Sequence, residues 1–272
     1  MGLTGLTRGR ASMGSPPPHR RPPHPPMTPT GPARPAPELD AFHRDGLVRL
    51  RGFHARARMG AIRERLLDEL ARLRVWNKGR PVGGPLNALP PFQQIAKLAS
   101  MVKLDLHDAL GTPELHRAIR ELGGQAPQGD QGTQLLLSLP HQGRWSLDGL
   151  NWHIDTTARP DDGIPGVQAF YLIDEVVPHG GATLALARSH RLPGEAARAL
   201  RAGLKSPTEA QAALLAADTE IVEMSGQAGD VFLMDMRVLH TPSINASKHI
   251  RMMATTRFLL PGQVRSGRGR LT

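Results

Sequence analysis

Three residues in this chain have the types and spacing of a metal site. His153 and Asp155 lie two positions apart at the end of a predicted strand, so their side chains project from the same face. His240 follows 85 residues after Asp155, at the end of a later predicted strand. Two imidazoles and one carboxylate on one face of an octahedron leave three positions open. This donor set is typical of non-haem Fe(II) sites that activate oxygen.

The His-x-Asp triplet alone is weak evidence for such a site. Chance supplies roughly 0.6 such triplets in a chain of this length and composition, and His43 with Asp45 forms a second one in a predicted helical turn. The segment from Gly229 to His240 distinguishes the two, because it supplies a strand, a turn and a histidine. Arg251 then follows on the returning strand, 11 residues after His240.

Four segments together resemble the phytanoyl-CoA dioxygenase family of Fe(II)/2-oxoglutarate enzymes. They are Phe42–Gly52, similar to that family's first strand; Trp152–Asp155, similar to its proximal metal motif; Gly181–Arg191, similar to its segment ending in Ser-His; and Gly229–His240 with Arg251, similar to its distal motif. The resemblance runs from Leu39 to about Leu260, which is about four-fifths of the chain.

The resemblance implies a role for each residue of this set. His153, Asp155 and His240 would hold Fe(II), with 2-oxoglutarate and O2 as co-substrates, and Arg251 would hold the far carboxylate of 2-oxoglutarate. An arginine suits this task because its planar fork forms two charge-assisted hydrogen bonds and stays protonated. The implied activity is oxidation, most simply hydroxylation, of a small metabolite in natural-product biosynthesis, with decarboxylation of 2-oxoglutarate to succinate.

Further residues are predicted to surround the co-substrate and the substrate. Gln134 and Ser138 have the four-residue spacing of two co-substrate contacts in the family, with Ser in place of the family's Asn. Thr183, and Ser243 after the distal histidine, are further candidates for co-substrate contact. The residues predicted to line a substrate pocket are Asn151, Trp152, Trp145 and Gln168, although Trp152 alternates with His153 and could face the core instead.

Arg257 lies six residues after Arg251 on the same predicted strand. The even offset predicts that both side chains face the same way. At ~3.3 Å per residue, Arg257 would lie about 20 Å further along the strand. We therefore expect it to be too far away to grip the same carboxylate.

Two other functions stay open at this point. A nucleic-acid base dealkylase is one, because the run from Arg251 to Arg257 is similar to that class's Arg-x-Asn-x-Thr-x-Arg signature. Against it, Met253 replaces the signature's Asn, and the chain has few aromatic residues to hold a flipped base. A non-catalytic jelly-roll binding protein is the second, since a fold does not imply a function. A halogenase is disfavoured, because halide requires the coordination position that Asp155 fills.

The charge distribution argues against a basic nucleic-acid-binding body. The formal net charge is +10, and eight of these charges come from five arginines in residues 1–37 and three in 263–272, where there is no acid. The chain has no cysteine, which excludes disulfides and thiolate zinc sites, and its apolar runs are too short to span a membrane. We expect a cytoplasmic protein with a small-molecule substrate and neither nucleic-acid nor membrane partners.

Proline content and hydrophobic periodicity divide the chain. Residues 1–37 predict a disordered Pro/Arg-rich arm, 38–262 a single dioxygenase domain, and 263–272 a basic tail. Helices are predicted over 58–76, 92–122 and 194–217, and strands over 47–53, 134–139, 150–154, 167–173, 182–187, 220–224, 231–235 and 250–260. This order predicts a mainly β fold with flanking helices, built on a double-stranded β-helix, that is, a cupin-like jelly roll.

Overall fold

The computed structural model describes residues 36–77, 79–81, 85–156, 162–206 and 208–261. The predicted basic tail and nearly all of the predicted arm lie outside the described residues. The first described helix begins at Ala36, two residues before the predicted start of the dioxygenase domain at residue 38. Pro37 lies in the first turn of that helix, where a missing backbone N–H costs nothing.

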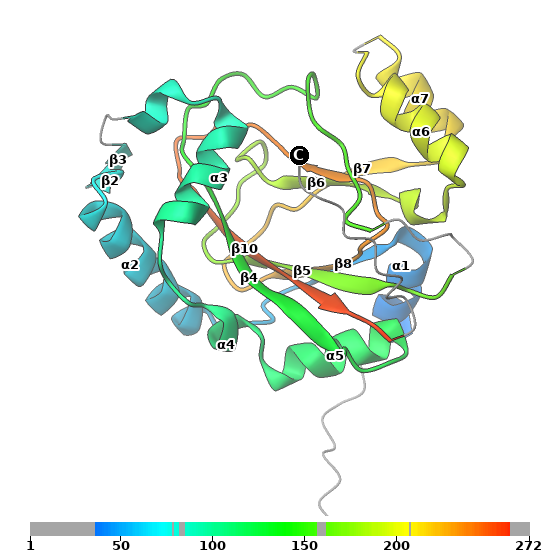
Figure 1. Cartoon of the computed structure of the whole chain (residues 1–272), viewed down its shortest axis with the longest axis horizontal. Coiled ribbons are helices and arrows are strands. Elements are labelled where there is room, and N and C mark those ends of the chain that lie inside the picture. Colours follow the sequence, from blue (N-terminus) through cyan, green and yellow to red (C-terminus); the bar gives the residue numbers. More distant parts are fainter. Residues whose placement is uncertain (1–35, 78, 82–84, 157–161, 207, 262–272) are drawn as a thin grey trace, which may run out of the picture. The chain divides into compact units, whose positions relative to one another are not determined.

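The elements follow one another in the order shown in Figure 1. The described helices are α1 (Ala36–Asp45), α2 (Arg56–Arg72), α3 (Pro91–Met101), α4 (His107–Leu110), α5 (Pro113–Gly123), α6 (Gly194–Gly203) and α7 (Ala210–Ala216), with short 3-10 helices at Pro85–Ala88 and Ser189–Arg191. The described strands are β1 (Leu47–Leu50), β2 (Trp76–Asn77), β3 (Arg80–Pro81), β4 (Gly129–Ser138), β5 (Gly166–Leu172), β6 (Thr183–Ala187), β7 (Glu220–Glu223), β8 (Val231–Asp235), β9 (His240–Pro242) and β10 (Arg251–Leu259).

Two antiparallel sheets form the core of the fold. The larger has the order β1-β8-β5-β10-β4, and the smaller has the order β7-β6-β9. From β5 to β10 the chain passes back and forth between the two sheets, as in a jelly roll. The predicted fold class, antiparallel sheets with flanking helices in a cupin-like arrangement, is confirmed.

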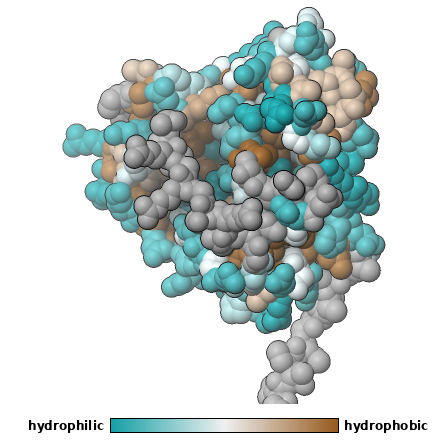
Figure 2. All heavy atoms as spheres, turned by 45° about the vertical axis from the view of Figure 1, so that its right-hand side comes forward, coloured by the Kyte–Doolittle hydropathy of each residue, from teal (hydrophilic) through white to brown (hydrophobic). Residues whose placement is uncertain are grey.

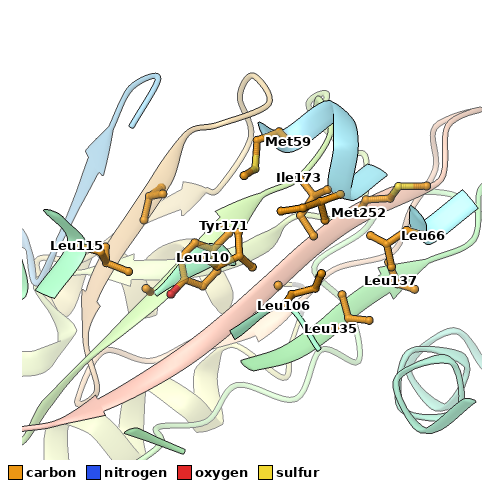
Figure 3. Close-up of a cluster of buried hydrophobic side chains, with 14 of the residues drawn as sticks. Met59, Leu66, Leu106, Leu110, Leu115, Leu135, Leu137, Tyr171, Ile173 and Met252 are labelled. Atoms are coloured by element: carbon orange, nitrogen blue, oxygen red, sulfur yellow. The ribbon is translucent and has the colours of Figure 1, made fainter. Parts of the chain in front are cut away.

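Helices cover one face of the five-stranded sheet. Figure 1 shows α2, α4 and α5 along the face that is turned away from the smaller sheet. Strand side chains alternate between the two faces, so every second residue of β4 and β5 points toward these helices. Figure 3 shows the resulting apolar cluster, in which Met59 and Leu66 of α2 meet Leu135, Leu137, Tyr171 and Met252 of the sheet and Ile173, which follows β5.

The opposite face of the five-stranded sheet packs on the smaller sheet. Phe170 of β5, Met234 of β8 and Met253 of β10 form a buried cluster there with Ala185 and Ala187 of β6. The intervening residues of β6, Leu184 and Leu186, point to the other side of the smaller sheet and pack with Leu200 and Leu204 from α6 and its end. The inner space between the two sheets is therefore separated from solvent by packed layers on both sides.

The predicted strand 150–154 is reduced to one antiparallel bridge, between His153 and His240. Its alternating pattern has another cause: Leu150 and Trp152 are buried in the cluster beside α6. Such alternation requires one buried face, and it does not require a hydrogen-bonded ladder. Helix α1, which buries Phe42, extends well beyond the helical turn predicted around His43 and Asp45.

The surface in view in Figure 2 is mostly hydrophilic, with apolar residues in small groups. Within the described ranges, Leu215 of α7 is the single large hydrophobic side chain that is mainly exposed. None of the helices in those ranges is both long enough and apolar enough to span a bilayer.

His54 is a buried histidine outside the predicted metal site. Its ring lies against the rings of Phe53 and Tyr171, with centroids 5.1 and 5.9 Å away, and its Nε2 has no hydrogen-bond partner in the structure described. Burial, together with the positive charge of Arg58, lowers the pKa of His54 to about 4. His54 is therefore neutral in the folded protein at neutral pH.

This burial predicts a loss of stability in mild acid. Between pH about 6.5, the ordinary histidine pKa, and pH about 4, the unfolded chain binds a proton at His54 that the folded protein does not. The free energy of unfolding therefore decreases as the pH is lowered through this window. We expect His54→Phe to reduce the slope of Tm against pH between 6.5 and 4, measured by calorimetry. Equal slopes of Tm against pH for the wild-type protein and the variant would contradict the low pKa of His54.

Candidate metal centre and co-substrate cavity

The structure brings the three predicted metal ligands together. One ligand atom from each of His153, Asp155 and His240 lies within 4.8 Å of the others. The two histidines are joined by backbone hydrogen bonds in both directions, of 3.0 and 2.9 Å, and the backbone N–H of Asp155 donates to the carbonyl oxygen of Met236. The main chain thus fixes all three positions before any metal is bound.

Both imidazoles are oriented with Nε2 available as a ligand. Nδ1 of His153 lies 3.0 Å from the carbonyl oxygen of Asn151, and Nδ1 of His240 lies 3.1 Å from that of Val238. Because a carbonyl only accepts hydrogen bonds, each Nδ1 carries a proton, and Nε2 is the ring nitrogen left to face a metal. Burial lowers the pKa of His240 to about 4, so this ring is neutral at physiological pH, as metal ligation requires.

Arg251 is a buried cation that lacks a counter-charge in the part of the chain described. Its side chain is among the most buried in the protein, and burial lowers its pKa to about 10, so it is still protonated at neutral pH. Its Nη1 donates to the carbonyl oxygen of Gly181, whereas Nε and Nη2 have no partner. A buried charge with two unused donors is costly unless an anion binds there. These donors fit the carboxylate of a co-substrate.

Two of the three metal ligands, His153 and His240, line the same cavity as Arg251. It has a volume of about 190 Å³ and is lined by Ile95, Gln134, Leu136, His153, Gln168, Phe170, Thr183, His240, Pro242, Arg251, Thr255 and Arg257. Of the predicted contacts, Gln134, Thr183 and Gln168 are therefore brought to the site. Gln168 donates to Thr255, and its buried Oε1 has no partner, which leaves an acceptor for a bound molecule.

Arg257 has a partner that the strand spacing does not predict. Its Nε lies 2.7 Å from Oδ2 of Asp155, and its Nη2 lies 3.1 Å from Oδ1. The even offset does place Arg251 and Arg257 on the same cavity, but Arg257 pairs with a metal ligand. Strand spacing measures the separation of backbones and takes no account of the reach of long side chains, so it gave no indication of this pair.

The two predicted serine contacts have their hydroxyl hydrogens engaged elsewhere. Ser138 is buried and donates to Oε1 of Gln142, at 2.9 Å, and Ser243 donates to the carbonyl oxygen of Ala182, at 2.7 Å. Neither residue lines the cavity. The hydroxyl groups therefore stabilise neighbouring loops in this arrangement.

Three predicted substrate contacts lie away from the cavity lining. Trp152 is buried in the apolar cluster beside α6, so it faces the core as the alternation allowed. Trp145 packs against the same cluster and stacks on His179, with ring centroids 4.3 Å apart. The Asn151 residue is exposed, and it serves the site through the backbone carbonyl that orients His153.

Several lining residues were missed by sequence reasoning. Leu136 and Phe170 lie two residues after Gln134 and Gln168, so strand alternation places each pair on one face and could have found them. Pro242 follows the metal ligand His240 by two positions in β9. Ile95 comes from helix α3, and nothing in its local pattern points to the cavity.

Comparison with known proteins identifies the family. The sequence matches phytanoyl-CoA dioxygenase (PhyH) over residues 42–253, which is more than half of the chain. The chain belongs to this family, and the predicted class of oxidoreductase, an Fe(II)/2-oxoglutarate-dependent oxygenase, is confirmed. No curated protein sequence gives a significant match.

Solved structures share the fold at low sequence identity. AviO1 from Streptomyces viridochromogenes Tue57 is 20% identical with a TM-score of 0.56, and the match covers 85% of this chain and 97% of that one. The α-ketoglutarate-dependent carbocyclase SnoK from nogalamycin biosynthesis is 18% identical with a TM-score of 0.54, over 86% and 89%. EvdO2 from Micromonospora carbonacea var. aurantiaca, solved with 2-oxoglutarate, is 15% identical with a TM-score of 0.55, over 86% and 94%.

The arrangement of ligands predicts how metal binding responds to substitution. Under anaerobic conditions, Fe(II) with 2-oxoglutarate should give a weak visible charge-transfer band, and His153→Ala or His240→Ala should abolish it because each removes one ligand. His249→Ala, which removes an exposed imidazole, is the matched control and should keep the band. A band that survives both ligand substitutions would refute this site.

Proposed function

We propose that this oxygenase hydroxylates a small metabolite of specialised biosynthesis and converts 2-oxoglutarate to succinate and CO2 in the same cycle. One atom of O2 enters the product and the other enters succinate, so the reaction balances without a further reductant. The observation that carries the proposal is Arg251, a buried cation with two unpartnered donors in the cavity lined by His153 and His240. Within that cavity, Arg251 can bind the carboxylate at one end of a molecule while a metal at the histidines binds its other end.

Each role in this proposal belongs to a described residue. His153, Asp155 and His240 would hold the iron, and Arg251 would hold the far carboxylate of 2-oxoglutarate through Nε and Nη2. Bound Fe(II), with 2-oxoglutarate and O2, supplies the oxidising chemistry. The remaining task of the chain is to orient the substrate and to exclude water. The apolar side chain of Phe170 forms part of the cavity wall.

A small substrate is favoured over an extruded nucleic-acid base. Phe170 is the single Phe, Tyr or Trp in the lining of this cavity, and a flipped base is normally held between aromatic or apolar faces. Met253, which stands where the dealkylase signature has Asn, packs in the apolar cluster between the sheets. Membership in the phytanoyl-CoA dioxygenase family also favours a metabolic substrate.

The structural relatives support specialised biosynthesis and leave the reaction to be tested. SnoK is described as a carbocyclase and SnoN as an epimerase, both from nogalamycin biosynthesis. The test is incubation with Fe(II), 2-oxoglutarate, O2 and a panel of small metabolites, with succinate and product mass as readouts. Succinate with a product that has gained one oxygen atom supports hydroxylation. A product that has lost two hydrogens, or has an unchanged mass, would replace hydroxylation with ring closure, desaturation or epimerisation.

The proposed role of Arg251 predicts a specific loss of co-substrate affinity. Lysine keeps the charge but cannot reproduce the two-pronged donor, and one lost charge-assisted hydrogen bond costs about 1.5–3 kcal/mol, or roughly 10- to 150-fold in binding. We expect Arg251→Lys to raise the Kd for 2-oxoglutarate at least about tenfold and to leave Fe(II) affinity nearly unchanged. Both are measured by titration of the charge-transfer band and by calorimetry.

The matched control is Arg63→Lys, on helix α2, whose Nε pairs with Asp174 outside the cavity. This substitution should leave 2-oxoglutarate affinity unchanged. Wild-type affinity in Arg251→Lys would show that the co-substrate carboxylate is held elsewhere.

A further inference from the structure

We infer that Arg257 is a positioning residue for the metal ligand Asp155, holding its carboxylate in the orientation that metal binding requires. The inference rests on the proposed iron- and 2-oxoglutarate-dependent function. It concerns the contact between Arg257 and Asp155, which the sequence did not predict.

The contact has the geometry of a two-pronged clamp. Nε and Nη2 of Arg257 bond Oδ2 and Oδ1 of Asp155, at 2.7 and 3.1 Å, so the planes of the two groups are held together. Oδ2 is also the oxygen that lies 3.8 Å from Nε2 of His240. In the described chain, Arg257 is the side chain that hydrogen-bonds this carboxylate. The clamp therefore fixes which oxygen faces the imidazoles.

The pair is shielded from solvent, which makes the contact stronger than one on the surface. The side chains of Asp155 and Arg257 are 10% and 26% exposed. An isolated carboxylate at such a depth is penalised, and a guanidinium in direct contact offsets much of this cost. The two hydrogen bonds thus hold Asp155 in one orientation before any metal arrives.

Strand β4 has a β-bulge opposite Arg257 of β10. The register of β10 with β4 shifts between Thr256 and Phe258: Thr256 pairs with Thr133 and Phe258 with Asp130. Two β4 residues, Gln131 and Gly132, therefore oppose Arg257 alone, and Gly132 has φ +73°, which suits glycine. A β-bulge increases local twist and redirects a side chain. The side chain opposite this bulge is the one that reaches Asp155.

The clamp and a metal can share the carboxylate. Each carboxylate oxygen has two lone pairs, so Oδ2 can accept from Nε–H and still bind a cation. The charge of Arg257 repels a dication, whereas its fork removes the rotational freedom that Asp155 would otherwise lose on binding. Partners that orient a metal ligand typically contribute 10- to 100-fold to metal affinity, so we expect orientation to outweigh repulsion.

The test compares Arg257→Met, which removes fork and charge, with Arg257→Lys, which keeps the charge. Co(II) affinity is measured by calorimetry without 2-oxoglutarate, and Tm and circular dichroism establish that both variants are folded. We expect Arg257→Met to weaken Co(II) binding about 10- to 100-fold, and Arg257→Lys to restore only part of the loss, because lysine has no fork. Arg63→Met, which breaks a comparable Arg–Asp pair on α2, should leave Co(II) affinity unchanged.

A double-mutant cycle separates positioning from a general structural effect. In an Asp155→Ala background, Arg257→Met should no longer weaken Co(II) binding, because the carboxylate to be oriented is gone. Unchanged or tighter binding in Arg257→Met alone would overturn the inference, and so would an equal loss in both backgrounds. Failure of the wild-type protein to bind Co(II) at all would instead refute the proposed function.

Discussion

The hydrogen-bonded pairing of β10 between β4 and β5 is the interaction on which the site depends. It holds one strand in the middle of the larger sheet, where alternation sends Arg251, Thr255 and Arg257 to the inner face. The same alternation sends Met252 to the helix-covered face. A slip of one residue in this pairing would bury a methionine at the metal site and turn both arginines toward the helices.

Charge in the cavity is unbalanced in a way that suits an anion. Its lining includes two arginines and no acid, and Asp155 pairs with one of the two. Arg251 has no acidic partner among the described residues, so it is left as a positive charge inside the protein. One carboxylate of a dicarboxylate would neutralise the charge of Arg251, and the other end of the molecule would bind the metal. The electrostatics and the donor set therefore favour the same class of molecule.

The metal ligands and the buried arginine could be predicted from the sequence by spacing and by resemblance together. A spacing of two in an extended segment brings His153 and Asp155 to one side, whereas the role of Arg251 was implied by the resemblance to the phytanoyl-CoA dioxygenase family. The partner of Arg257 could not be predicted, because the contact depends on a bulge in the neighbouring strand and on the length of the arginine side chain. The two residues are also 102 positions apart in the sequence. Trp152 shows the same limit: alternation predicts a buried face but not which of two apolar layers it enters.

Helix α3 contributes Ile95 to the cavity wall, whereas the other lining residues come from the strands or from the His153 bridge beside them. The groups that carry out the chemistry are therefore anchored in the sheets, and this part of the wall is not. Substitutions in α3 can reshape what the cavity accepts without moving a ligand atom. In evolution, substrate preference can therefore change through substitutions in α3 while the residues of the metal site stay the same.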